Sequence, residues 1–258
     1  MTEGASRNDP GQPADSMQRA YAQVREAILL GELEPGAWVS QVQLAARLKL
    51  SRTPLREALR RLQTEGLVQL DFNRRLRVSA LSVPDLESLY ALRIVTEPLA
   101  VRLSVPQLQA ADIEDLADAL TAMNVASDRG EEAAALSHHH RFHFGLFAYA
   151  EDRLRAQVEN MWDHSVRYVR LYDPAPSYRF SLIVMGRADH ERIYAAAAAR
   201  REAETAWLVA EHLARTALTV IANVASEHDP RVIREALAFV RGAVPASSGQ
   251  IVRADAAT

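Results

Sequence analysis

The chain of 258 residues contains no cysteine, a single lysine and only 6% aromatic residues. Without cysteine, disulfide bonds and metal sites built on thiolates are excluded. No apolar run reaches the roughly 18 residues that a membrane-spanning helix needs, and the polar start is not typical of a signal peptide. We therefore expect a cytoplasmic protein without a membrane partner. The hydrophobic share of 48% is enough to form a large buried core.

The charges are unevenly distributed along the chain. Residues 17–79 carry eleven lysines and arginines against six acidic residues, which is a net charge of +5. Residues 80–258 carry eighteen against twenty-four, which is −6. A basic segment joined to an acidic remainder indicates a polyanion-binding module attached to a domain with another task. Chance variation between segments is the alternative explanation of this imbalance, and the motifs must distinguish it from a polyanion-binding module.

Residues 17–80 show the spacing of three short helices followed by a β-hairpin. Ser40 is the expected N-cap of the second helix, and Ser51 or Thr53 the expected cap of the third. Two short apolar segments on either side of a turn are expected to form the strands. This order of elements predicts a winged helix-turn-helix domain. We expect the polar residues 1–16 to form a disordered tail in front of it.

The third helix carries four arginines within ten residues and hydroxyl side chains at its start. Guanidinium groups bind guanine edges or phosphates, and hydroxyls and helix-start N–H groups bind phosphates, so such a helix fits the major groove of DNA. The alternative is a solvated face whose arginines pair with Glu57 and Glu65. The candidates for DNA contact on this helix are Ser51, Arg52, Thr53, Arg56 and Arg60.

The segment SRTPLREALRRLQTEGLV resembles the DNA-binding domain of the GntR family of bacterial transcription regulators, and the similarity covers nearly all of residues 17–80. The resemblance implies that the start of the third helix contacts an operator. Three features depart from the family pattern. Val42 stands where a polar or basic residue is usual, Lys49 stands where glycine is common, and the hairpin reads NRR instead of NRG. We expect Arg74 and Arg75 of this more basic wing to contact DNA as well.

From Ser82 onward the sequence has helical periodicity and no strand alternation. We expect an all-α bundle of six to eight helices over residues 81–244. Pro and Ser interrupt the pattern between Asp173 and Ser177. A flexible tail is expected at residues 245–258.

The stretch SHHHRFH contains four histidines within six residues. On a helix His139 and His143 share a face and could chelate one ion, with His140 as the competing partner of His143. Imidazole is a good ligand for zinc, nickel, copper and iron. Two later helices offer His190 and His212. Spacing alone leaves a metal site and ordinary buried or solvated histidines as equal alternatives.

The segment LYALRIVTEPLA resembles the opening of the FadR-type effector domain, called the FCD domain, over roughly residues 84–226. Many members hold a divalent metal between the Asp and the His of a D-x-x-F-H motif and two later histidines. The resemblance assigns His143, His190 and His212 to the three histidines. His139 stands in place of the aspartate. Four imidazoles favour zinc or nickel over manganese, magnesium or calcium.

The resemblance implies a regulator, not an enzyme, that binds a palindromic operator in double-stranded DNA as a homodimer. Its effector would be a small carboxylic acid at the divalent metal ion. Arg93 is the first candidate to bind this effector, and a salt bridge with Glu97 is the equal alternative. Two other functions are alternatives: a DNA-binding regulator whose metal is structural, and a metal-dependent hydrolase with Glu191 as the base, although no HExxH motif is present.

Overall fold

The computed structural model describes residues 13–71, 75–171 and 186–243. These residues form ten α-helices, one short 3-10 helix and three strands. The chain folds into two compact units. The first holds the described residues up to Ser82 together with the second half of helix α7 (Asp152–Leu171), and the second holds the others. A winged helix-turn-helix followed by an all-α domain is confirmed.

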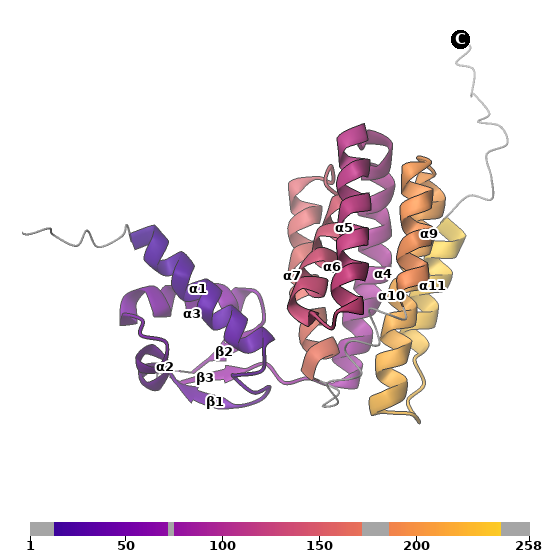
Figure 1. Ribbon diagram of the computed structural model, residues 1–258. Helices are drawn as coiled ribbons and strands as arrows, with labels where there is room; N and C mark the ends of the chain where they lie inside the picture. Colours follow the sequence, from indigo (N-terminus) through magenta and orange to yellow (C-terminus); the bar gives the residue numbers. More distant parts are fainter. Residues whose placement is uncertain (1–12, 72–74, 172–185, 244–258) are drawn as a thin grey trace, which may run out of the picture. The chain divides into compact units, whose positions relative to one another are not determined.

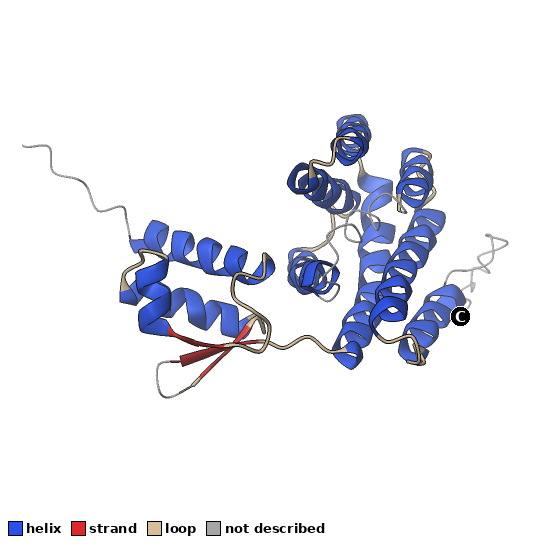
Figure 2. Cartoon of the chain, turned by 60° about the horizontal axis from the view of Figure 1, so that its bottom comes forward, coloured by secondary structure: helices blue, strands red, loops and turns tan. Residues whose placement is uncertain are grey.

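The first unit consists of three helices and a small antiparallel sheet whose strand order is β1-β3-β2 (Figure 1). In the view of Figure 2 the strands lie along one side of the helices. In the sheet, Val39 of β1 is opposite Leu76 of β3, and Val68 of β2 is opposite Val78 of β3. The elements are α1 (Pro13–Leu29), β1 (Trp38–Ser40), α2 (Gln41–Arg47), α3 (Arg52–Thr64), β2 (Val68–Leu70) and β3 (Arg75–Val78).

The core of this unit follows from the spacing of its apolar residues. On α3, Leu55, Leu59 and Leu62 are three or four residues apart and are buried against the other elements. On β3, Leu76 and Val78 alternate with exposed arginines. Packing on one face therefore leaves the arginines of α3 and β3 on the surface.

Four details of this unit differ from the sequence-based expectations or extend them. Helix α1 begins at Pro13, so residues 13–16 are helical and are not part of a disordered tail. Strand β1 was not predicted. Ser40 and Ser51 occupy the N-cap positions of α2 and α3, but neither side chain bonds to its helix. Lys49 has a φ of +54°, a left-handed conformation that explains why glycine suits this turn. Arg74 lies outside the described residues.

The second unit is a bundle in which α4 packs against α10 and α11, α5 against α6 and α9, and α9 against α10 (Figure 1). The break expected at residues 173–177 and the tail expected at 245–258 lie outside the described residues. None of the described helices is long and apolar enough to cross a membrane. The elements are α4 (Val83–Ser104), the 3-10 helix (Val105–Gln107), α5 (Ala110–Asp128), α6 (Glu132–Leu146), the first half of α7, α9 (Arg187–Ala198), α10 (Glu202–Val224) and α11 (Arg231–Ala243).

Candidate metal centre and DNA-contacting surface

Four histidines from three helices of the second unit meet inside the bundle. His139 and His143 come from α6, His190 from α9 and His212 from α10, and one ring nitrogen of each lies within 4.8 Å of those of the others. The Nε2 atoms of His143 and His190 are 3.2 Å apart. With metal–nitrogen bonds of about 2.1 Å, this separation corresponds to an angle of about 100° at a shared ion, between the octahedral and tetrahedral values. The arrangement therefore fits a metal ion.

The neighbouring histidines of α6 are not part of this cluster. His140 stacks on Phe144 with the ring centroids 3.9 Å apart, and it lies nearly perpendicular to the ring of Trp162, with the centroids 5.4 Å apart. His139 lies against His143 instead, with the centroids 4.5 Å apart. The helical repeat thus brings together the pair that is four residues apart, as the motif predicts.

The surroundings keep the rings of His139, His143 and His190 uncharged. His143, His190 and His212 are buried, whereas His139 retains some contact with solvent. Burial, and then the proximity of the other histidines, holds the pKa values of His143 and His190 well below the ordinary value of 6.5. Burial likewise lowers the pKa of His139 to about 3. Neutral imidazole is the form that binds a metal ion, so these three rings are in the ligating state at neutral pH.

Two buried ring nitrogens of the cluster have no hydrogen-bond partner among the described residues. They are Nδ1 of His143 and Nδ1 of His190. Buried polar atoms are nearly always satisfied, and the exceptions often mark a water molecule or an ion outside the protein. An ion bound to the facing Nε2 atoms would not satisfy these Nδ1 atoms, so they are not evidence for the metal ion itself.

Asp189 supports the cluster from outside. Its Oδ2 lies 3.5 Å from Nδ1 of His212, a long contact, and its Oδ1 accepts a hydrogen bond of 2.8 Å from Arg215. Interaction with His212, followed by the charges of the nearby arginines, holds the pKa of the Asp189 carboxyl below its ordinary value. A carboxylate beside Nδ1 orients the ring so that Nε2 is free for a metal. Asp189 is not among the site residues predicted from the sequence, although it directly precedes His190.

We expect Asp189→Asn to weaken the binding of a divalent metal by 10- to 100-fold, because the carboxylate no longer orients and polarises the His212 ring. Competition with a chromophoric chelator would measure the Kd. Asp115→Asn is the matched control, since Asp115 is exposed and pairs with Arg141 on the surface. A Kd within about twofold of the wild-type value for Asp189→Asn would contradict this role.

Arg93 lies beside the cluster and makes the ion pair that was weighed against an effector contact. It is 3% exposed, and its Nε donates a hydrogen bond of 2.5 Å to Oε1 of Glu97. Its guanidinium lies 5.4 Å from the centroid of Trp162, whose ring is 5.2 Å from that of His139. Glu97 therefore compensates the charge of Arg93. Because Arg93 also lies next to the histidines, its contact with an effector stays a proposal.

The arginines of α3 divide into two groups. Arg52, Arg56 and Arg60 are exposed and form no ion pair with any described residue. Arg61 instead donates to Glu65 and lies over the ring of Tyr21, 3.9 Å from its centroid. The predicted pairing with an acidic residue thus holds for Arg61, whereas the other three remain available for DNA.

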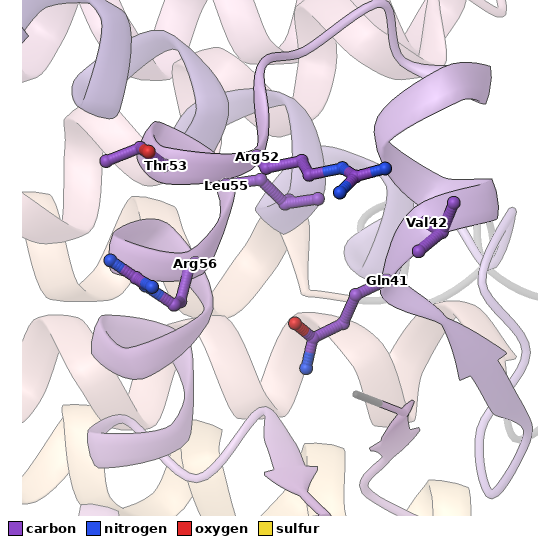
Figure 3. Close-up of a pocket in the computed structure, with 6 residues that line it drawn as sticks. All are labelled: Gln41, Val42, Arg52, Thr53, Leu55 and Arg56. Carbon is purple, nitrogen blue, oxygen red and sulfur yellow. The ribbon is translucent and has the colours of Figure 1, made fainter. Parts of the chain in front are cut away.

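The start of α3 and the start of α2 enclose a small hollow of about 290 Å³. Figure 3 shows the Arg52 side chain reaching toward α2, with Gln41 and Val42 on the far side and Thr53 and Arg56 on α3. Ser51 and Thr53 are exposed at this helix start.

On the sheet, exposed Arg75 lies over the ring of Trp38, 5.3 Å from its centroid.

Comparisons with known proteins point to one family. Residues 16–78 match the model described as bacterial regulatory proteins, gntR family, and residues 88–215 match that of the FCD domain. The chain is 34% identical to the Nta operon transcriptional regulator of Aminobacter aminovorans over 181 residues, 69% of this chain and 82% of the relative. It is 26% identical to the HTH-type regulator YdhC of Bacillus subtilis over 67% of this chain and 77% of the relative.

Solved structures support the fold. McbR/YncC of E. coli superposes with a TM-score of 0.71 at 20% identity, covering 81% of this chain and 98% of that protein. A regulator from Rhodococcus sp. RHA1 gives a TM-score of 0.65 at 22% identity, with the same coverage. Both matches extend over a helix-turn-helix and a helical domain in this order.

Proposed function

Since the chain belongs to the gntR family of bacterial regulatory proteins and its helix-turn-helix is followed by an FCD domain, we propose that a small carboxylic acid controls its binding to DNA. The acid would bind at a divalent metal held by His139, His143, His190 and His212. The DNA site would be a palindromic operator, bound by a homodimer in the cytoplasm. The observation that carries the proposal is the cluster of four imidazole nitrogens inside the FCD domain.

The composition of the cluster supports an anionic effector. When bound, the metal supplies a Lewis-acidic positive charge to which a carboxylate oxygen can coordinate. Four neutral imidazoles, unlike three imidazoles and a carboxylate, leave the charge of a divalent ion unreduced. The partly exposed His139 marks the side on which solvent reaches the cluster, and Arg93 would donate hydrogen bonds to the effector's other oxygens.

Exposed leucines on α4 support a homodimer. Leu92, Leu99 and Leu103 are 58%, 51% and 48% exposed and are seven and four residues apart. This spacing places them along one face of the helix, as in the seams of paired helices. A second copy of the chain would cover this face. Pairing also suits the DNA-binding task, because a single recognition helix reads too few bases for useful affinity.

The effector can change operator affinity only if it binds two states of the dimer with different strength. The four histidines come from α6, α9 and α10, so a ligand held at their centre would favour the state in which these three helices are closest. The second half of α7 belongs to the same compact unit as the helix-turn-helix, while its first half belongs to the bundle. A change in the arrangement of the bundle helices would therefore reach the helix-turn-helix through helix α7.

The test measures operator affinity of the metal-loaded chain by fluorescence anisotropy, with and without acetate, succinate or citrate. The DNA is a duplex selected from a random pool by the wild-type chain. We expect at least one acid to raise the melting temperature and to change operator affinity about 5- to 150-fold, the usual range of allosteric coupling. Both effects should disappear after the metal is removed with a chelator.

The matched control is the His143→Ala variant, in which the acids should change neither quantity. If chelation lowers the melting temperature but no acid alters operator affinity, the metal is structural, and the effector part of the proposal is wrong. The hydrolase alternative has no support: the relatives carry the names of regulators, and Glu191 is exposed whereas His190 is fully buried.

A further inference from the structure

Val42 is an exposed apolar side chain that lines the hollow between the starts of α2 and α3, where the other lining residues are polar except for the buried Leu55. It is 49% exposed and is the second residue of α2. The same hollow is lined by Arg52, Thr53 and Arg56 at the start of α3 and by the neighbouring Gln41 (Figure 3). Single exposed apolar residues are common on protein surfaces, so the neighbours of Val42, and not its exposure, give it meaning.

The polar residues of the hollow can serve both the phosphates and the bases of DNA. Arginine binds guanine edges and phosphates, glutamine binds adenine edges, and threonine binds bases or phosphates. The isopropyl group of valine binds neither phosphates nor the polar edges of bases, because it cannot form a hydrogen bond. On the base edges of the major groove, the thymine C5-methyl group is the apolar partner available to such a side chain.

We propose that Val42 determines operator specificity by packing against the C5-methyl group of a thymine next to the bases contacted by Arg52 and Arg56. Burying one methyl group in this contact contributes about fourfold in affinity for each half-site. A homodimer on two half-sites would gain roughly the square of that factor. The inference rests on the family's DNA binding and is independent of the metal and the effector.

The test replaces thymine by deoxyuridine, which removes only the methyl group and keeps every hydrogen bond. The wild-type chain first selects a duplex from a random pool, and each thymine of a half-site is then exchanged in turn. At one position deoxyuridine should weaken wild-type binding about fourfold. Val42→Ala changes both protomers, so it should bind the unmodified duplex at least roughly sixteenfold more weakly, and it should be insensitive to the exchange at that position.

Val125→Ala is the matched control, because it makes the same change at an exposed residue of α5 and should bind both duplexes as the wild type does. The proposal is overturned if no deoxyuridine weakens wild-type binding, or if one weakens wild type and Val42→Ala equally. Failure to select any duplex would contradict DNA binding itself and remove the basis of the proposal. A new selection with Val42→Arg should recover guanine at the position of the thymine.

Discussion

Replacing His143 by alanine is expected to remove the bound metal ion and to lower the melting temperature of the metal-loaded protein by roughly 10 °C. A ligand at a thousandfold excess over its Kd stabilises the folded state by about 4 kcal/mol. Each kcal/mol corresponds to about 2–4 °C in a protein of this size. His143 is 1% exposed and its Nε2 faces that of His190. Alanine therefore removes one of the four ligands. Elemental analysis of tag-free protein and thermal unfolding with and without chelator measure both effects.

His138→Ala is the control, since this histidine lies on the same helix but outside the cluster. It should retain about one divalent ion per chain, as the wild type should. An ion retained in His143→Ala, or absent from every variant, would count against the metal centre. Protein expressed in a medium with balanced metals should contain zinc or nickel. Recovery of manganese alone would show that the softness of the ligands does not select the metal.

Removing one partner of the buried ion pair between Arg93 and Glu97 is expected to lower the free energy of unfolding by about 3–5 kcal/mol. The two residues are 3% and 0% exposed, so Glu97→Ala leaves a guanidinium without a carboxylate inside the bundle. Replacing both by methionine removes both charges at similar volume and should restore most of the stability. Denaturant unfolding followed by tryptophan fluorescence measures the difference, because Trp162 lies beside Arg93.

A loss in the double variant equal to the sum of the losses in the two single variants would show that the two charges do not depend on each other. The double variant also separates the two roles weighed for Arg93. If Arg93 binds the effector, the double variant should keep its metal and lose the thermal shift caused by the acid. An unchanged shift would leave Arg93 with the structural role alone.

The sequence predicts the first unit well because its signals are local. The leucines of α3 are three or four residues apart, Pro54 lies in the first turn of α3, and Gly66 follows its last turn. The start of α1 at Pro13 could not be predicted, because the residues before Met17 are polar and lack a helical pattern. Strand β1 escaped detection for another reason: its three residues form a strand only by pairing with β3, which lies more than thirty residues later.

The candidate metal centre shows the same difference between local and distant signals. His139 and His143 share one helix, so their pairing follows from the helical repeat. His190 lies 47 residues after His143 and on another helix, and only the resemblance to a known domain connected the two. Asp189 could not be assigned to the site from the sequence. Its contact with His212 joins α9 to α10, and no repeat of residue types in the sequence predicts a contact between two helices.

The wide separation of the four histidines along the chain has a topological consequence. An ion bound by them would close loops of 47 residues between His143 and His190 and of about 22 residues between His190 and His212. In the chain-entropy model, a covalent bridge over loops of this length stabilises a fold by roughly 3–4 kcal/mol, by restricting the unfolded chain. The protein has no cysteine with which to form such a bridge. Its histidines would provide a removable cross-link that needs no oxidant to form and that reducing conditions leave intact.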